Sequence, residues 1–358
     1  MKIVNIVGAR PQFVKAAVIS RALKKIKSAK EIIIHTGQHF DTKMSNVFFE
    51  EMHIPNPDYN LGINNLSHAA MTGRMLEKIE ELLLAEKPDF VIVYGDTNST
   101  LAGALAAKKI YIPLVHIEAG LRSFNMLMPE EINRILTDRI SDILFCPTKK
   151  AIENLHNEGF DKMNCRIVHS GDVMQDAAIY YSNFAKIPKT VIPNKFILCT
   201  VHRSENTNNK QNLLEIFSAF DKINEIIPIV IPLHPRTRIK LKEYGYNFSK
   251  TKIKIIDPAS YFEMIYLLKN CQIVMTDSGG LQKEAYFFQK NCITLREETE
   301  WTELVEFGCN ILTKVSTNEI INSFYKMNEK ISDFSNPLYG DGHAGEMIVN
   351  YLYASLLT

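Results

Sequence analysis

The sequence lacks the features that mark several common classes of protein. Its formal net charge is only +1 over 358 residues, so charge gives no reason to expect a nucleic acid or an anionic membrane as a partner. No apolar run approaches the roughly 18 residues that a membrane-spanning helix needs. No targeting signal precedes the first strand-like run. The six cysteines form no CxxC pair and no metal-ligand spacing, which favours buried free thiols in a reducing cytoplasm.

Common signatures for nucleotide binding are also missing. No expected strand is followed by a G-x-G-x-x-G fingerprint, and no G-x-x-x-x-G-K-[ST] loop occurs, so we expect neither a nicotinamide enzyme nor a P-loop NTPase. The sequence contains no D-x-D pair. Because arginines and a helix N-terminus can carry the charge of a diphosphate, we predict no NAD and no metal as cofactors.

Short apolar runs alternate with helix-like segments along the whole chain. A chain of 358 residues with 46% apolar residues predicts two globular domains. Strands this apolar, separated by helices, indicate parallel sheets that are covered on both faces. We therefore predict an α/β fold of two Rossmann-like, doubly wound domains. The expected strands are KIVNIV, EIIIHT, DFVIVYG, PLVHIE and DILFCPT in the first half and KFILCTV, PIVIPL, IKIID, QIVMTD and CITLRE in the second.

The division between the domains is predicted from composition. The first domain is expected to hold residues 1–172, joined by a terminal helix within 344–358, and the second to hold 173–343. The linker is expected between Gly171 and Lys195, where IPKTVIPNK carries two prolines.

Ionisable residues follow several expected strands of the first half. Ligands bind at the carboxyl ends of the strands of open parallel sheets, so these residues are candidates for a site. A single carboxylate here could simply cap a helix N-terminus, but several separated strand ends each supply an ionisable group. Glu118 is the hardest to explain as a cap, because an unpaired carboxylate at the end of an apolar strand would be costly. The candidates are Arg10, Lys15, His39, Asp96, Glu118, Glu130 and Arg134.

The second half places a glycine turn and several cations at its strand ends. Ser278-Gly279-Gly280 precedes a helix, where glycines allow close approach of a phosphate and the helix supplies N–H groups. An ordinary tight turn has the same letters, but the histidines and arginines after neighbouring strands favour a phosphate site. Glu284 could receive ribose hydroxyls or face solvent. The cations are His202, Arg203, His234 and Arg236.

Eight segments, spread over nearly the whole chain, match one protein family in the order in which that family carries them. Together they are specific for the family, although no single segment is. They are GARPQFVKAA, TGQHFD, VYGDTNSTLAGALAA, HIEAGLRS, PEEINR, HRSEN, TDSGGLQKEA and NPLYGDG. The set resembles the non-hydrolysing UDP-N-acetylglucosamine 2-epimerase family. The resemblance implies a GT-B-type glycosyltransferase fold and an isomerase that inverts C2 of a UDP-sugar by eliminating and re-adding UDP. It also implies a cytoplasmic homodimer whose product enters polysaccharide synthesis, such as that of O-antigen.

The resemblance carries roles onto matching residues. Asp96, Glu118 and Glu130 would form the acid–base group, while Arg10 and His202 would bind and stabilise the diphosphate. The phosphate and ribose would be held by Ser278, Gly279, Gly280 and Glu284. The remaining binding residues would be Lys15, His39, Arg134, His234 and Arg236.

Two segments depart from many members of the family. The chain has TEWTE at 299–303 where many members have Thr-Glu-Arg-Pro-Glu, and SFNMLM stands before PEE. Both features look more like the subgroup that acts on UDP-2,3-diacetamido-2,3-dideoxyglucuronate. A uronate needs a cation for its C6 carboxylate, and Arg122, Arg134 and Arg236 are candidates. The first two could instead pair with Glu118 and Glu130.

Three other functions fit the same pattern of residues. A GT-B-type UDP-sugar glycosyltransferase would have the same donor site, and a hydrolysing 2-epimerase would release UDP. A nucleotide-sugar sensor would bind without turnover. The three clustered carboxylates favour the epimerase, because a metal-free transferase needs at most one base.

Overall fold

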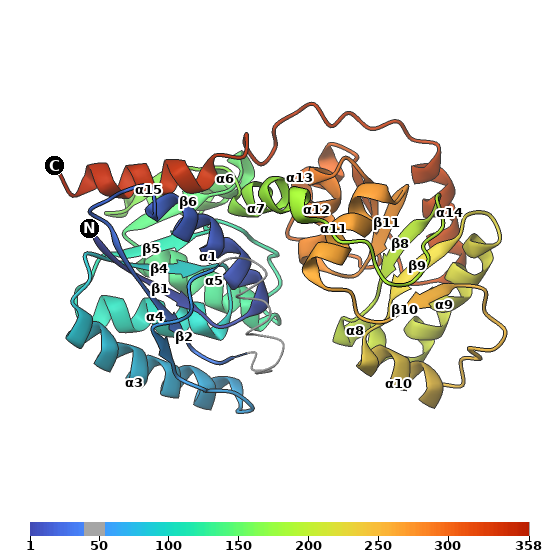
Figure 1. Cartoon of the computed structure of the whole chain (residues 1–358), viewed down its shortest axis with the longest axis horizontal. Helices are drawn as coiled ribbons and strands as arrows, with labels where there is room; N and C mark the ends of the chain where they lie inside the picture. Colours follow the sequence, from blue (N-terminus) through green and yellow to red (C-terminus); the bar gives the residue numbers. More distant parts are fainter. Residues whose placement is uncertain (39–53, 358) are drawn as a thin grey trace. The chain divides into compact units, whose positions relative to one another are not determined.

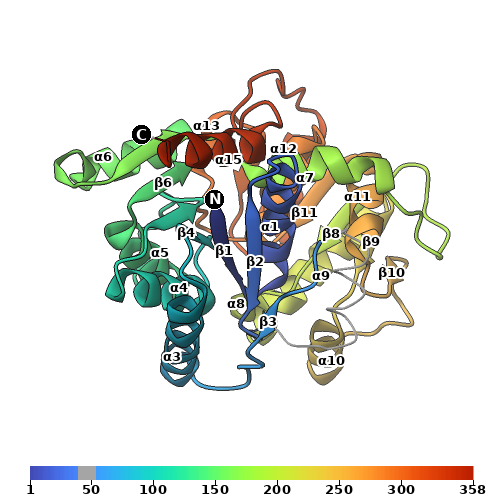
Figure 2. The same cartoon turned by 60° about the vertical axis from the view of Figure 1, so that its left-hand side comes forward.

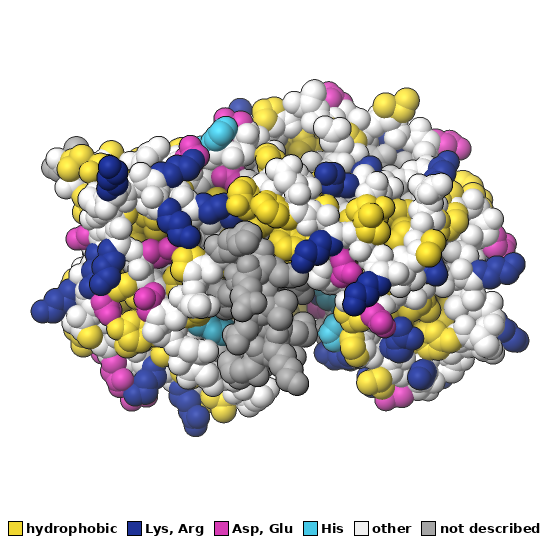
Figure 3. Space-filling view, viewed as in Figure 1, with side chains coloured by type: hydrophobic (Ala, Val, Ile, Leu, Met, Phe, Trp, Pro, Cys, Tyr) yellow, Lys and Arg dark blue, Asp and Glu magenta, His cyan; other side chains and the backbone are white. Residues whose placement is uncertain are grey.

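The structure is a computed structural model that describes residues 1–38 and 54–357, and of Arg10 the backbone alone. The chain divides into two compact units: unit 1 holds Met1–Ala177 and Leu338–Thr358, and unit 2 holds Ala178–Pro337 (Figure 1). On the face drawn in Figure 3, Lys and Arg side chains are interspersed with Asp and Glu. No helix within the described ranges is long and apolar enough to cross a membrane.

Unit 1 is built on a parallel sheet of seven described strands in the order β3-β2-β1-β4-β5-β6-β7. The strands are β1 (Lys2–Val7), β2 (Lys30–His35), β3 (Tyr59–Asn60), β4 (Phe90–Tyr94), β5 (Leu114–Ile117), β6 (Ile143–Cys146) and β7 (Arg166–His169). The α-helices are α1 (Arg10–Leu23), α3 (His68–Glu86), α4 (Asn98–Lys109), α5 (Pro129–Ile140), α6 (Lys149–Asn157), α7 (Val173–Tyr181, which runs on into unit 2) and α15 (Ala344–Ser355).

Successive side chains of the strands in unit 1 point to opposite faces of its sheet, and helices cover both faces. Val4 and Ile6 of β1 share a core with Ile79 of α3 and Ala102 of α4. Figure 2 shows α3 and α4 on one side of β1 and β2, and α1 on the other. The expected helix near the end of the chain is confirmed as α15, which packs on α1.

Unit 2 is built on a second parallel sheet of six strands, in the order β10-β9-β8-β11-β12-β13. The strands are β8 (Ile197–Thr200), β9 (Ile229–Pro232), β10 (Lys254–Ile256), β11 (Ile273–Thr276), β12 (Asn291–Thr294) and β13 (Asn310–Leu312). The α-helices after α7 are α8 (Ser204–Thr207), α9 (Lys210–Asn224), α10 (Pro235–Glu243), α11 (Tyr261–Asn270), α12 (Gly279–Phe287), α13 (Thr302–Glu306) and α14 (Thr317–Asn328).

The two parallel sheets confirm the predicted α/β class, and all ten expected strands are present. Three further strands, β3, β7 and β13, are not predicted because each lies at a sheet edge and is short or half-exposed. Within the expected linker, Val173–Tyr181 form α7, and the boundary between the two units lies inside this helix. All six cysteines are free and all but the half-buried Cys165 are buried, as expected.

Candidate active site

The turn after β1 is occupied by a side chain of the protein itself. Gln12 Oε1 accepts hydrogen bonds from the N–H groups of Gly8 at 2.8 Å and Ala9 at 3.0 Å. These two N–H groups are therefore already used. Gly8 has a packing role, because a Cβ there would lie 2.1 Å from Ser99 Oγ and 2.2 Å from Thr36 Oγ1. The turn resembles a phosphate loop in sequence but is internally satisfied.

The letters G-x-G-x-x-G do occur once, at Gly340–Gly345, ahead of α15 rather than behind a strand. Gly345 allows close helix packing, since a Cβ would lie 2.4 Å from Val18 Cγ1. The carboxylate of Asp176 accepts the N–H groups of Ala344 and Gly345 at 3.1 and 2.8 Å. A carboxylate of the chain thus fills the helix N-terminus where a dinucleotide fold would bind pyrophosphate.

The turn that follows β4 is held at three successive carbonyl groups. Gln12 Nε2 donates to the carbonyl of Tyr94 at 2.8 Å, and His116 Nε2 lies 2.7 Å from the carbonyl oxygen of Gly95. Asn133 Nδ2 donates to the carbonyl of Asp96 at 2.9 Å. The three side chains come from α1, β5 and α5, so separate elements fix the backbone that carries Asp96.

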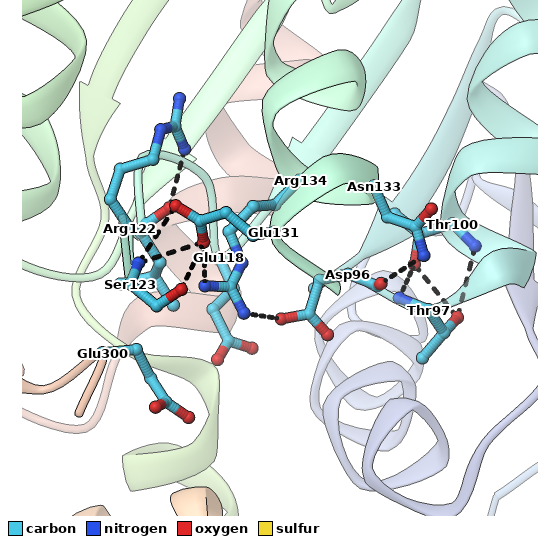
Figure 4. Close-up of polar contacts among 12 residues, drawn as sticks. Asp96, Thr97, Thr100, Glu118, Arg122, Ser123, Glu131, Asn133, Arg134 and Glu300 are labelled. Carbon is cyan, nitrogen blue, oxygen red and sulfur yellow. Dashed lines mark hydrogen bonds and ion pairs between the residues drawn. The ribbon is translucent and has the colours of Figure 1, made fainter. Parts of the chain in front are cut away.

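The Asp96 carboxylate forms an ion pair with Arg134 of α5, whose Nη1 also lies 2.7 Å from Glu131 Oε2. Figure 4 shows the guanidinium of Arg134 lying between the two carboxylates. Burial alone would raise the pKa of Asp96, but the charges of Arg134 and Lys15 outweigh it and lower that pKa. Asp96 is therefore held as a carboxylate, as a proton acceptor requires.

Lys15 and Glu118 form a second ion pair, and each side chain is about nine-tenths buried. The pair lies over the turn after β4, because a Cβ on Gly95 would be 3.2 Å from Lys15 Nζ and 3.8 Å from Glu118 Oε2. Glu118 has a φ of +72°, a left-handed conformation that costs a non-glycine residue roughly 1–2 kcal/mol. Strain of this kind is typical of functional sites. The structure thus brings Lys15, Asp96, Glu118 and Arg134 together.

The two glutamates of PEEINR have different surroundings. Glu131 is fully buried, and its carboxylate accepts the N–H groups of Ser123 at 3.0 Å and Phe124 at 2.9 Å. Glu130, in the first turn of α5, is exposed. Glu131 therefore fixes the loop that leads to α5, and Glu130 is the one free to reach a ligand.

In unit 2, Asp277 organises the segment after β8. Its fully buried carboxylate accepts the N–H groups of His202 and Arg203, each at 3.0 Å, and the side-chain amide of Asn206 at 3.1 Å. The His202 ring is about half exposed, with Nδ1 3.7 Å from Asp277 Oδ1. Asp277 thus fixes the backbone beneath an accessible imidazole.

His234 and Arg236 lie at the start of α10, where both are exposed. The His234 ring accepts the Arg236 N–H at 3.2 Å through Nδ1. Partial burial and the neighbouring charges of His202 and Arg236 lower the pKa of His234. The neighbouring strands β8 and β9 therefore bring these three side chains close together.

The start of α12 carries the glycine turn. Ser278 is the N-cap residue, and its N–H donates to Thr276 Oγ1 at 2.9 Å. A Cβ on Gly279 would lie 2.3 Å from Glu300 Oε1, whereas one on Gly280 would meet no atom within 4 Å. The Glu300 carboxylate thus lies against Gly279, whereas the space beside Gly280 is open. Glu284 is half-buried further along the same helix.

The comparison with known families decides what this arrangement belongs to. The family model described as UDP-N-acetylglucosamine 2-epimerase matches residues 21–353. The chain belongs to this family.

The sequence of this UDP-sugar 2-epimerase, an isomerase, is similar to those of several curated members over their whole lengths. It is 52% identical to UDP-2,3-diacetamido-2,3-dideoxy-D-glucuronate 2-epimerase of Pseudomonas aeruginosa, covering 98% of this chain and 99% of that one. It is 44% identical to UDP-N-acetylglucosamine 2-epimerase of Methanocaldococcus jannaschii, again over 98% and 99% of the two chains.

Solved structures show the same fold. The crystal structure of the Methanocaldococcus jannaschii enzyme in complex with UDP-GlcNAc and UDP is similar with a TM-score of 0.90 and 44% identity, over 99% of this chain and 100% of that one. MurG of Acinetobacter baumannii, 11% identical with a TM-score of 0.58 over 99% and 100% of the two chains, shows the fold alone. The predicted GT-B-type fold and the family resemblance are both confirmed.

The structure of this epimerase shows which carboxylates pair with Arg122 and Arg134. Arg122 pairs with Asp138 at 2.7 Å and with Glu158 at 2.6 Å, and Arg134 pairs with Asp96 and Glu131. The alternative pairing of Arg122 with Glu118 or Glu130 is therefore wrong. The buried carboxylates of Glu131 and Asp138 and the half-buried one of Glu158 follow no expected strand, which is why they are missed.

Two expected residues cannot be placed in this site. His39 lies outside the described residues, as does the side chain of Arg10. The supporting residues Gln12, His116 and Asn133 are missed by sequence reasoning, although each lies within a quoted family segment.

Proposed function

We propose that this epimerase acts on UDP-2,3-diacetamido-2,3-dideoxy-D-glucuronate and inverts C2 by eliminating and re-adding UDP. The observation that carries the proposal is the sequence identity of 52% to the Pseudomonas aeruginosa enzyme for this sugar, against 43% and 44% to two archaeal UDP-N-acetylglucosamine 2-epimerases. A UDP-N-acetylglucosamine 2-epimerase homolog of Methanococcus maripaludis is 50% identical. The SFNMLM segment before PEE supports the same choice. UDP-N-acetylglucosamine is the second candidate, because those archaeal relatives cover 98% of the chain as well.

In this proposal unit 1 performs the proton transfers. One carboxylate removes the C2 proton while the bond from C1 to the UDP oxygen breaks, which leaves a 1,2-unsaturated sugar and free UDP. UDP then adds back to C1 as a proton returns to the other face of C2. Asp96, Glu118 and Glu130 supply the acid and the base. The charges of Arg134 and Lys15 beside two of these carboxylates support the proposal, since they keep Asp96 ionised.

Unit 2 binds the UDP moiety in this proposal. The N–H groups at the start of α12, with Ser278, Gly279 and Gly280, would hold the phosphate, and Glu284 would receive the ribose hydroxyls. His202 would stabilise the departing diphosphate together with His234. The exposure of both rings after neighbouring strands supports this role.

The cation for the C6 carboxylate is expected outside the ion pairs of unit 1. Arg122 and Arg134 each face two carboxylates of the chain, so neither charge is left over for a uronate. Arg236 is exposed and donates to Asn208 Oδ1 at 2.9 Å, which leaves its charge unneutralised by that contact. We therefore assign Arg236 as the remaining candidate.

Incubation of the purified protein with each UDP-sugar alone in deuterium oxide tests the proposal. The proposed reaction incorporates deuterium at C2, forms the 2-epimer as its UDP-sugar and consumes the diacetamido-uronate faster than UDP-N-acetylglucosamine. Faster turnover of UDP-N-acetylglucosamine would support the second candidate. Accumulation of free sugar and UDP would indicate a hydrolysing enzyme. Turnover that needs an added acceptor would indicate a glycosyltransferase, and binding without exchange would indicate a sensor.

We further propose a cytoplasmic homodimer whose product enters surface polysaccharide synthesis, such as that of O-antigen. The family resemblance supports this assignment. Light scattering coupled to size-exclusion chromatography tests the oligomeric state, and a monomer at micromolar concentration would contradict it.

A further inference from the structure

The imidazole of His116 lies between two hydrogen-bond acceptors. Its Nδ1 is 2.7 Å from Asp138 Oδ1, and its Nε2 is 2.7 Å from the carbonyl oxygen of Gly95. A carbonyl oxygen and a carboxylate can only accept, so both ring nitrogens must carry a hydrogen. We propose that His116 is a buried imidazolium, with a hydrogen on each ring nitrogen, that positions the Asp96 turn. This role rests on the proposed function of Asp96.

The alternative is that Asp138 carries the proton and donates it to a neutral ring. The other oxygen of Asp138 argues against this, because it accepts from Arg122 Nη1 at 2.7 Å and from the Gly120 N–H at 3.1 Å. Burial raises the pKa of Asp138, but His116 and Arg122 outweigh it and lower that pKa. The carboxylate therefore stays ionised and the proton stays on the ring.

A buried charge is stable only when it is paired, and His116 belongs to a set of charges that balances. The His116 and Asp138 side chains are fully buried, as is that of Arg122. Arg122 in turn holds Glu158 through two parallel bonds of 2.6 and 2.8 Å. With His116 charged, this quartet has two cations and two carboxylates, whereas a neutral ring would leave one negative charge in excess.

Other titratable and charged groups lie close to the quartet. The charge of Asp96 is coupled to that of His116, and Asp96 is itself a carboxylate, which favours the imidazolium. The cations Lys15 and Arg134 oppose it, but Lys15 is paired with Glu118, and Arg134 is paired with Asp96 and Glu131. The thiol of Cys146 stays neutral, because burial raises its pKa well above the usual range.

The hydrogen on Nε2 is the one that contacts the backbone of the Asp96 turn. Gly95 has a φ of +61°, a conformation that glycine adopts without strain, so its own backbone preference does little to fix the following peptide. The contact from His116 holds the Gly95 carbonyl, and the next residue carries the Asp96 carboxylate. A neutral ring with its hydrogen on Nδ1 would turn a bare nitrogen toward the Gly95 carbonyl oxygen and lose this contact.

The charge of the ring is measured by nitrogen-15 NMR of the full chain labelled at its histidines, with His116→Gln used to assign the signals. We expect both nitrogens of His116 to show imidazolium shifts at about pH 8, where a free imidazole is neutral. A neutral tautomer at about pH 8 would overturn the inference.

The positioning role is measured by kinetics of His116→Gln and Asp138→Asn with the UDP-sugar that the protein turns over. We expect kcat to fall about 10- to 100-fold while KM changes less than about threefold, because misplacement of a catalytic group affects the chemical step. In Asp138→Asn the ring loses its charged partner, so kcat should also fall as pH rises through the neutral range. Asp142→Asn is the matched control, since it removes the Lys108 ion pair of 2.7 Å in the same unit without touching the turn.

An unchanged kcat in folded His116→Gln would overturn the positioning role, whatever the NMR result. If His116→Gln fails to fold, Asp138→Asn and its pH profile decide the role in its place. Full turnover in Asp96→Asn would contradict the proposed function of Asp96 and with it the positioning role. In that case the NMR result would still decide the charge of His116.

Discussion

Replacing Gly280 by alanine separates what α12 needs in order to fold from what it needs in order to bind UDP. A Cβ at this position meets no atom within 4 Å, and the residue is the second of the helix. Alanine should therefore stabilise the helix by about 0.5–1 kcal/mol relative to glycine. For a unit of this size that gain corresponds to a rise in Tm of roughly 1–4 °C.

The affinity for UDP should fall in Gly280→Ala, although the helix becomes more stable. If the N–H groups of this turn hold the phosphate, the added methyl group keeps it from approaching the backbone. Loss of one charge-assisted hydrogen bond is worth about 1.5–3 kcal/mol, so the Kd for UDP should rise roughly 10- to 100-fold. Isothermal titration calorimetry with UDP and a thermal melt of the same preparation measure both effects.

Gly73→Ala is the matched control for this experiment. Gly73 is an exposed glycine within α3, and a Cβ there also meets no atom within 4 Å. It should give a similar gain in Tm with no change in UDP affinity. If Gly280→Ala binds UDP as tightly as the parent protein, the start of α12 does not hold the phosphate, and that part of the proposed function is wrong.

Four further substitutions test unit 1. Asp96→Asn and Glu118→Gln should each lower kcat by about 10²- to 10⁴-fold with UDP affinity retained, and normal turnover would remove them from the acid–base group. Gln12→Leu leaves the N–H groups of Gly8 and Ala9 without their acceptor, so urea unfolding should show a loss of about 2–4 kcal/mol; no loss would show that the turn can rearrange. Burial raises the pKa of Asp176 to about 6, so its contribution to stability is full below about pH 4 and is lost as pH rises through about 6. Asp176→Asn cannot titrate and should not show that loss, which amounts to at most about 3 kcal/mol. The difference in unfolding free energy between this variant and the parent protein should therefore vary with pH, and a constant difference would contradict the prediction.

The sequence predicts the strands well where they are buried, because a continuous apolar run is a strong signal. Since the polar residues directly after such strands meet at one edge of the sheet, the sequence also predicts that Asp96 and Glu118 lie close together. The edge strands carry weaker patterns, so β7 and β13 are missed.

The residues that hold the Asp96 turn could not be predicted in this way. The contact from His116 depends on the register that pairs it with Val93, two residues before Gly95, and a sequence pattern does not specify register. No sequence pattern shows that the amide of Gln12 fills the turn after β1. Of the two adjacent glutamates in PEEINR, only the fold shows which one is buried.

The packing of α15 onto α1 has a consequence for how the protein is made. Ala344, Ile348, Val349 and Leu352 of α15 are buried in unit 1, whose other elements all precede unit 2 in the chain. During synthesis, the sheet of unit 1 emerges from the ribosome first but must wait for about 160 residues of unit 2 before its covering helix arrives. Unit 2 is continuous and can fold as soon as it emerges. The half that is translated first is therefore the half that is completed last, and until then its exposed apolar surface is the one that chaperones would need to protect.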